Sequence, residues 1–367
     1  MRRARWWGAL APVAWVVLLA GPAAADPAQP GDVRSEVVRL TPDVPGVEAG
    51  VVGGDSFLRL RVDDGIEVVV LGYEGEPYLR IRSDGTVEVN DRSPARWLNE
   101  NRLAAVGLPP TADAAAEPTW RRIGSGGETA WHDHRTHWMA ASRPDPPERD
   151  WSVPLLVDGR PATIEGRYVY SPPPPAWPWW TGALVFAAAI IPLGRRHRPV
   201  AAGSVMTAGG LAVAVGLELR RLPGGGQGGV AAVTLGLLAI AGAIAAWRIR
   251  RAAFAGAFLA GAGAALLAYS LPRLDVLRHA VLVTDLPAWT DRLSVALALG
   301  SGAAAVVLGL SAVLAPTAGP RRGQQAPGRS TGERSARRSD QSGSQLGGYQ
   351  PSGTSASASG GPQDPRS

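Results

Sequence analysis

Residues 171–196 read SPPPPAWPWWTGALVFAAAIIPLGRR, and this stretch separates two parts of the chain that suit different solvents. Its four consecutive prolines form a stiff, extended spacer. The indoles of Trp177, Trp179 and Trp180 favour the interface between membrane and water. The apolar run that follows is close to the length that crosses a hydrocarbon core. We therefore expect a water-soluble domain to end here, at a Pro/Trp junction covering 173–180, and a membrane-spanning region to begin.

The second half of the chain contains five apolar segments of nearly membrane-spanning length. We place a transmembrane region at 181–315, with spans at about 178–194, 200–219, 229–247, 252–271 and 293–315. No span carries Asp, Glu, Lys, Arg or His near its middle, and Met206 is the only methionine in them. Pumping of protons or passage of soft metal ions is not expected, because both need ionisable or thioether groups at depth.

Small residues at four-residue spacing predict where the spans pack together. Gly256 with Ala260, and Ala257 with Gly261, are two such pairs. Small side chains let helix backbones approach closely in a membrane, where apolar burial between helices contributes little. The spans are therefore expected to form an anchor or an assembly surface.

The first 25 residues have the pattern of a secretory signal peptide. Three arginines among the first five residues precede an apolar run at 6–19, and three alanines at 23–25 provide a small-residue cleavage site. A retained anchor helix is the alternative interpretation. Under both, the segment after residue 25 is delivered outside the cytoplasm.

Export of the first domain sets the expected orientation of the spans. The first span then runs inward, which places the arginines at 195–198, 248–251 and 321–322 on the inner side, as the positive-inside rule requires. Five further arginines fall outside on this interpretation: Arg220, Arg221, Arg273, Arg278 and Arg292. We expect a multi-pass protein of the plasma membrane, with the lipid bilayer as its first partner, its N-terminal domain outside and its C-terminal tail in the cytoplasm.

The tail at 316–367 consists mainly of Gly, Ser, Gln, Arg and Pro. Such a composition buries too little apolar surface to offset the entropy lost on ordering, so a disordered tail is expected. The formal net charge of +6 does not indicate a nucleic-acid partner, because many arginines flank the apolar segments or lie in this tail.

The exported domain at 26–172 is expected to be all-β and sandwich-like, with antiparallel strands. Three Asp-Gly pairs, at Asp64-Gly65, Asp84-Gly85 and Asp158-Gly159, each lie between runs in which apolar and polar residues alternate. This pattern predicts β-hairpins. We expect hairpins of 59–62 with 66–71, of 78–82 with 86–89, and of 153–157 with 163–170. Residues 94–117 are expected to form a helical turn and a long loop.

Several kinds of chemistry are excluded by composition. The chain has no cysteine, so disulfides, thiolate nucleophiles, iron–sulfur clusters and Cys-ligated zinc sites are impossible. The exported domain also lacks a Gly-x-Ser-x-Gly nucleophile elbow. We expect a non-enzymatic protein with no catalytic residue.

One segment carries candidate chemistry. Residues 131–139 read WHDHRTHWM, and they hold three of the five histidines of the chain: His132, His134 and His137. On a straight strand His132 and His134 would share one face, while His137 and Met139 would share the other. All four converge only if the chain turns around Arg135 and Thr136. Given that turn, three imidazoles with a thioether suit copper, and imidazoles with Asp133 suit zinc.

Two functions remain open from the residues. In the first, His132, His134, His137 and Met139 bind copper or zinc outside the membrane, for capture or delivery of the metal. In the second, Trp131 and Trp138 are core residues, Asp133 and Arg135 fix a structural loop, and the domain is a scaffold that recruits an envelope protein partner.

The segment from Trp131 to Met139, followed by a strand pair, a proline-rich run and several spans, resembles an uncharacterised class of exported multi-pass membrane proteins of actinobacteria. The resemblance covers the chain apart from the signal peptide and the tail. It implies an association with copper handling, and it implies no catalytic residue.

Overall fold

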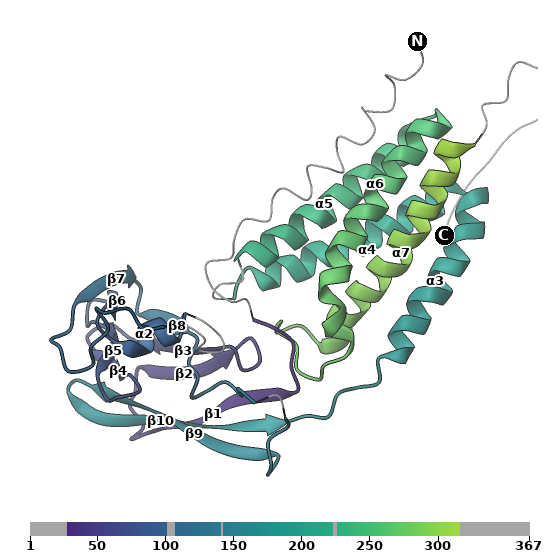
Figure 1. Ribbon diagram of the computed structural model, residues 1–367. Coiled ribbons are helices and arrows are strands. Elements are labelled where there is room, and N and C mark those ends of the chain that lie inside the picture. Colours follow the sequence, from purple (N-terminus) through teal and green to yellow (C-terminus); the bar gives the residue numbers. More distant parts are fainter. Residues whose placement is uncertain (1–27, 101–106, 141, 223–225, 316–367) are drawn as a thin grey trace, which may run out of the picture. The chain divides into compact units, whose positions relative to one another are not determined.

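A computed structural model describes residues 28–100, 107–140, 142–222 and 226–315 (Figure 1). The predicted signal peptide at 1–25 and the predicted disordered tail at 316–367 lie outside these residues. Within them, antiparallel β structure at 33–170 precedes five long apolar helices. The expected fold class, a sandwich-like all-β domain followed by an all-α membrane region, is confirmed for the described part of the chain.

The β domain contains ten strands in the described residues. They are β1 (Val33–Thr41), β2 (Val47–Val52), β3 (Phe57–Val62), β4 (Val68–Leu71), β5 (Pro77–Ile81), β6 (Val87–Asn90), β7 (Trp120–Gly124), β8 (Glu128–Trp131), β9 (Glu148–Val157) and β10 (Arg160–Tyr170). One sheet has the strand order β1-β10-β9-β4-β5-β6-β7, and the other has the order β2-β3-β8. Every paired strand is antiparallel to its neighbour.

Both sheets contribute to one hydrophobic core. On β3 the side chains of Leu58, Leu60 and Val62 are buried while those between them are exposed, which is the period-two alternation of a strand with one face in the core. From the larger sheet the most deeply buried members of this core are Val68, Val70, Leu79, Ile81, Val87, Val153, Leu155 and Ile164. The domain therefore has a packed interior of its own and does not need disulfides.

Two of the three predicted hairpins are confirmed. Strands β5 and β6 pair through Ile81 and Val87 around Asp84-Gly85. Strands β9 and β10 pair from Val157 and Arg160 onward, so their loop is the two residues Asp158 and Gly159. Both loop residues have positive φ, +48° and +75°, which is the conformation that matches the twist of a hairpin.

The third predicted hairpin, around Asp64-Gly65, is wrong. The chain does turn there, since Gly65 has a φ of +93°, but the strands on either side belong to different sheets. Both edges of β3 are occupied by β2 and β8, whereas β4 lies between β5 and β9. An Asp-Gly turn reverses the chain equally well within a sheet or between two sheets, so the local signal does not specify the pairing.

The short helix α2 (Pro94–Leu98) matches the helical turn predicted within 94–117. Its position is set by Glu76, whose buried carboxylate accepts hydrogen bonds from Ser93 Oγ at 2.6 Å and from the Ala95 N–H at 3.4 Å. A carboxylate at a helix start satisfies backbone N–H groups that have no partner within the helix.

Five helices of the described residues are long and apolar enough to cross a membrane. They are α3 (Trp177–Arg196), α4 (Arg198–Leu219), α5 (Gly226–Arg248), α6 (Ala252–Ser270) and α7 (Ala288–Leu314), and the 3₁₀ segment η1 (Leu271–Leu277) continues α6. The five predicted spans coincide with these helices. The protein is therefore a polytopic membrane protein.

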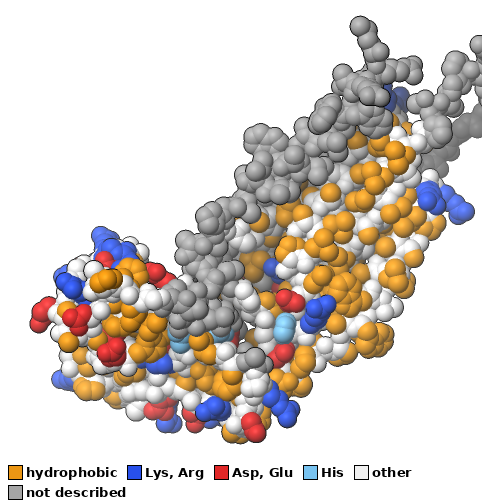
Figure 2. Space-filling view, in the orientation of Figure 1, with side chains coloured by type: hydrophobic (Ala, Val, Ile, Leu, Met, Phe, Trp, Pro, Cys, Tyr) orange, Lys and Arg blue, Asp and Glu red, His pale blue; other side chains and the backbone are white. Residues whose placement is uncertain are grey.

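The helical region has small residues inside and large residues outside. Its interior cluster is mostly alanine, with Val205 and Leu266 among the few larger members. Large hydrophobic side chains such as Leu184, Phe254 and Leu314 are exposed. Figure 2 shows hydrophobic side chains covering the visible face of these helices, while charged side chains gather on the β domain and near helix ends. This distribution is typical of helices whose outer surface contacts lipid.

Glycines allow the helix backbones to touch. A Cβ added at Gly263 of α6 would lie 2.6 Å from the carbonyl oxygen of Gly302 on α7, and one added at Gly302 would lie 2.9 Å from the carbonyl oxygen of Gly263. The predicted packing pair Gly256 and Ala260 also faces α7, at Gly309. Gly261, from the second predicted pair, has no atom within 4 Å of the position its Cβ would take. Only the first pair therefore marks a contact face.

The helical region has two ends, which are named here by the residues that they hold. We call the end that holds Trp177 and η1 the proximal end, and the end that holds Gly194 and Leu308 the distal end. Figure 1 shows the helices running alternately between the two. The distal end carries six arginines: Arg195, Arg196, Arg198, Arg248, Arg250 and Arg251.

The proximal end contains a buried ion pair that the sequence analysis does not predict. Asp291, 1% exposed, accepts a hydrogen bond from Arg273 Nη2 at 2.6 Å and a weaker one from Thr284 Oγ1 at 3.4 Å. Helix α7 begins at Ala288, earlier than the predicted start at 293. The predicted span left this first turn out because Asp291 is charged. In the structure Asp291 is paired with Arg273, which allows the turn to be helical and buried.

Candidate functional site

The histidine segment begins where β8 ends. Trp131, the last residue of β8, pairs with Leu58 of β3 and is buried in the core. Beyond it the chain leaves the sheet and turns, with the Thr136 N–H donating to the carbonyl oxygen of Asp133 at 2.9 Å and Thr136 Oγ1 donating to the same oxygen at 3.0 Å. This is the turn that the spacing of the histidines requires if their side chains are to meet.

The turn brings the three imidazoles together. The ring centroid of His132 lies 5.1 Å from that of His134 and 5.1 Å from that of His137. The His132 and His134 rings meet edge to face, with an interplanar angle of 76°, and the His132 and His137 rings are tilted by 57°. His132 is therefore the central member of a histidine cluster formed by these three residues.

The loop between β2 and β3 places oxygen atoms beside two of the rings. His132 Nδ1 lies 2.8 Å from the carbonyl oxygen of Ser56, and His137 Nδ1 lies 2.7 Å from Asp55 Oδ2. In a neutral imidazole, an Nδ1–H that faces an oxygen acceptor leaves the lone pair on Nε2. Histidines that bind metals through Nε2 usually have Nδ1 held in this way by a carbonyl or a carboxylate.

Asp55 and Ser56 are site residues that the sequence analysis does not identify. They lie 76 positions or more before the histidines that they contact, in a turn with no distinctive motif. The only local signal is Gly53-Gly54, whose φ values of +71° and +81° make the turn possible. The strand pairing of β3 with β8 brings this turn to the histidines.

His134 is held by Tyr73. Their rings are stacked, with centroids 6.2 Å apart and an interplanar angle of 12°. The backbone N–H of His134 donates to Tyr73 Oη at 3.1 Å. Tyr73 Oη in turn donates to Asn99 Oδ1. Burial, and then the negative charge of Asp133, raise the pKa of Tyr73 above its ordinary value. The phenol therefore stays protonated and acts as a hydrogen-bond donor, not as an anionic ligand.

Asp133 is held by its neighbours in the chain, as expected if Asp133 and Arg135 fix the loop. Its carboxylate is 0% exposed and accepts hydrogen bonds from Trp131 Nε1 at 3.0 Å, from the Arg135 N–H at 3.0 Å, and from Arg135 Nε and Nη2 at 2.9 Å and 2.8 Å. These four donors occupy both oxygens. Desolvation would lower the pKa of Arg135, but the hydrogen bonds and charge of Asp133 raise it, so the pair is ionic.

The two residues after His137 point to different environments. Trp138 packs edge to face on Tyr168, with centroids 5.7 Å apart, and its Nε1 donates to the Ser142 carbonyl at 2.8 Å. Met139 is 39% exposed. No contact described for Met139 joins its thioether to the three imidazoles.

The cluster is not arranged as a finished metal site. Within residues 28–100, 107–140, 142–222 and 226–315, no group of three or more His, Asp or Glu side chains is positioned to hold a metal ion. The rings are adjacent, but their donor atoms do not meet at one point. Binding of one ion by all three imidazoles therefore requires at least one ring to rotate.

The other two histidines lie elsewhere in the chain. His279 Nδ1 is 3.2 Å from Asp32 Oδ2, next to a backbone bridge between Gly31 and Val281. His197 is the single residue between α3 and α4. No contact described for His279 joins it to the histidine cluster.

No family model, no curated protein and no solved structure matches this chain. The resemblance to exported actinobacterial membrane proteins therefore stays a prediction. What the histidine cluster does has to be argued from its own geometry.

Proposed function

We propose that this polytopic membrane protein presents its β domain outside the plasma membrane, where the histidine cluster captures or delivers a copper or zinc ion without catalysing a reaction. The ligands are the Nε2 atoms of His132, His134 and His137. Met139 is a further ligand for copper if the segment after Trp138 moves toward the imidazoles.

The observation that carries this proposal is the position of Nδ1 in two of the three rings, 2.8 Å from the Ser56 carbonyl oxygen in His132 and 2.7 Å from Asp55 Oδ2 in His137. A histidine that only fills the core needs one hydrogen-bond partner, and any ring nitrogen can serve. Here the same nitrogen, Nδ1, faces an oxygen atom in His132 and in His137, which is the arrangement usual for histidines that bind a metal through Nε2.

The spacing of the rings also supports the proposal. Two imidazoles bound to one tetrahedral ion at ~2.0–2.1 Å hold their ring centroids roughly 5 Å apart. His132 lies 5.1 Å from each of its two neighbours. These two ring separations are therefore compatible with a shared ion once the donor atoms are turned toward one point.

We expect the full-length chain in nanodiscs to bind about one Cu(II) or Zn(II) ion in calorimetric titrations, because three imidazoles are a sufficient ligand set for either metal. The variant with His132, His134 and His137 all replaced by alanine should lose this binding. Asp55→Ala should weaken it by roughly 10–100-fold, since partners of ligating histidines contribute to affinity by that amount.

His279→Ala is the matched control for the metal titration, because it removes a histidine paired with a carboxylate outside the cluster. Its titration should equal that of the wild type. Equal, weak uptake by the wild type and the triple variant would refute the metal site. The segment would then be a structural loop, and recruitment of an envelope partner by the β domain would be the function to test.

The charge pattern of the helix ends supports the proposed orientation. No acidic residue lies between 166 and 217 or between 219 and 274, so the six distal arginines have no carboxylate near them in sequence. At the proximal end, Arg273 pairs with Asp291 and Arg221 pairs with Glu218. The distal end is thus the more positive one, which favours the cytoplasm.

An alkaline phosphatase fused after the last residue should be inactive in intact cells, because this enzyme needs the oxidising exterior to form its disulfides. The same enzyme fused after residue 172 should be active. The opposite pair of activities would reverse the orientation and remove the histidine cluster from the exterior.

A further inference from the structure

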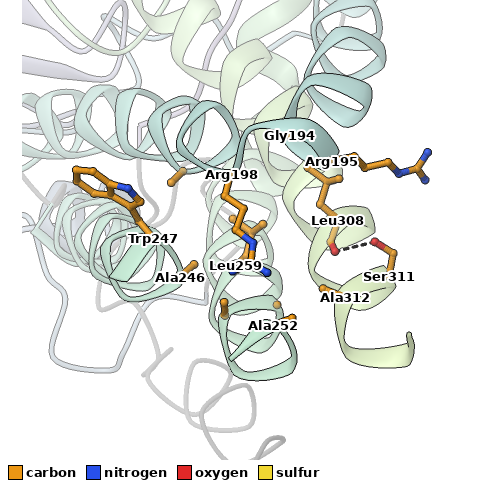
Figure 3. A pocket seen from close by; sticks show the side chains of 13 residues that line it. Gly194, Arg195, Arg198, Ala246, Trp247, Ala252, Leu259, Leu308, Ser311 and Ala312 are labelled. Carbon is orange, nitrogen blue, oxygen red and sulfur yellow. Dashed lines mark hydrogen bonds between the residues drawn. The ribbon is translucent and has the colours of Figure 1, made fainter. Parts of the chain in front are cut away.

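A pocket of about 220 Å³ opens at the distal end of the helices. All five helices or the turns beside them contribute to it, and Figure 3 shows its side chains. Most of the lining residues are small or apolar: Gly194, Ala202, Ala246, Ala252, Ala255, Gly256, Leu259, Leu308 and Ala312. The hollow exists because these helices meet through alanine and glycine, whose side chains do not fill the space between diverging helix ends.

The rim of this distal pocket is positively charged. Arg195 and Arg198 line it, and Figure 3 shows the Arg198 side chain reaching over the pocket while Arg195 points outward. No salt bridge joins either arginine to a carboxylate of the described residues. A guanidinium over an apolar hollow has donors for an anion and no internal partner for them.

Two helix starts add to the positive field. Helices α4 and α6 begin at Arg198 and Ala252, which both line the pocket, and neither helix has a side-chain cap. The first backbone N–H groups of a helix have no partner within it, and the helix dipole places partial positive charge at that end. The pocket therefore combines a guanidinium with the positive ends of two helix dipoles.

The position of the pocket indicates what fills it. Trp247, which also lines the pocket, is exposed, as tryptophans at a membrane–water interface are. Exposed Leu193, Phe254 and Phe258 lie on the helices that surround it. A molecule bound here has an anionic group at the level of the lipid headgroups and apolar surface below it.

We propose that the distal pocket binds an anionic glycerophospholipid, with its phosphate on Arg198 and its glycerol and first methylene groups in the apolar hollow. The volume supports this occupant, because pockets for whole drug-sized ligands measure about 300–1,000 Å³. A smaller hollow suits part of a molecule whose acyl chains continue along the outer faces of the helices. A free phosphate ion would use the arginine and leave the apolar walls in contact with water. This site is independent of metal binding by the histidine cluster.

The test measures lipid retained by the full-length chain after extraction from bilayers that contain phosphatidylglycerol in phosphatidylcholine, using native mass spectrometry. The wild type should retain one phosphatidylglycerol. Arg198→Gln should lower its occupancy about fivefold or more, since one arginine near the membrane surface contributes about that factor in binding anionic lipid. Ala252→Leu should lower it as well by filling the hollow.

Each variant has a matched control at the distal end of the helical region. Arg196→Gln removes a neighbouring arginine that does not line the pocket, and Ala253→Leu enlarges a neighbouring exposed alanine that does not line it. Both should retain the lipid as the wild type does. An equal loss in Arg196→Gln would mean that the lipid is held by diffuse charge, and the pocket would not be a site. Displacement of the lipid by inorganic phosphate would assign the arginine to a free anion and overturn the proposal.

Discussion

Replacing Asp133 by alanine should destabilise the β domain by about 3–5 kcal/mol, the usual cost of leaving one member of a buried ion pair without its partner. Asp133 is fully buried and holds Arg135, whose guanidinium would remain in the interior facing Tyr73 at 5.0 Å. Trp131 Nε1 would lose its acceptor too. Pulse proteolysis of the full-length chain over a urea series, read on the β-domain fragment, measures the loss.

Two variants show whether this loss comes from the buried charge. Glu148→Ala removes an acidic residue of the same domain that pairs with Arg167 in an exposed position, and it should change stability by less than about 1 kcal/mol. The double variant Asp133→Leu with Arg135→Met removes both charges and should recover much of the stability. If the double variant is as unstable as Asp133→Ala, the lost turn, not the unpaired charge, is the cause.

Leucine in place of Gly263 should separate α6 from α7 and destabilise the helical region by about 3 kcal/mol, at the upper end of the usual cost of overpacking. The new side chain would meet the Gly302 carbonyl oxygen at 2.6 Å and Ala305 Cβ at 2.9 Å, and neither atom belongs to a flexible side-chain end. Unfolding in mixed micelles with rising SDS, followed by circular dichroism, measures the change.

Gly261→Leu is the control for this substitution. It lies two residues away on the same helix, and the position of its Cβ has nothing within 4 Å. Its unfolding midpoint should stay close to that of the wild type, because the added Cβ meets no atom of a neighbouring helix within 4 Å. Equal destabilisation by both variants would show that leucine disturbs α6 itself, and the close contact with α7 would not explain the effect.

The five long helices and two of the hairpins were predictable because each is encoded locally. Apolar segments of spanning length predict α3 to α7, and Asp-Gly between alternating runs predicts the hairpins at Gly85 and Gly159. The wrong pairing at Gly65 has a physical reason. A turn signal covers four residues, whereas the choice of sheet depends on β2, β8 and β9, which are remote in sequence.

The candidate site was predictable only in part for the same reason. The spacing of His132, His134 and His137 predicts that they meet if the chain turns, and the turn is present. Asp55 and Ser56 are not predictable from spacing, since only the pairing of β3 with β8 brings their loop to the imidazoles. For Asp133 the sequence left two roles open, and its hydrogen bonds to Trp131 and Arg135 agree with the loop-fixing role.

The proximal end shows how hydropathy misplaces a helix boundary. A charged residue lowers the apolar score of its whole window, so the predicted fifth span begins at 293, after Asp291. The structure begins the helix at Ala288 and buries Asp291 against Arg273, which lies 18 positions earlier in the chain. Hydropathy counts charges one at a time, and it does not register that two opposite charges neutralise each other.

Gly256 belongs both to the distal pocket and to the contact between α6 and α7. It lines the distal pocket, and its backbone also touches α7, where an added Cβ would lie 2.6 Å from the Gly309 carbonyl oxygen. A ligand that binds in this pocket only while α6 and α7 are in contact stabilises that contact by mass action. The composition of the surrounding bilayer then acts as a thermodynamic variable of folding, as the concentration of a ligand does for a protein in solution.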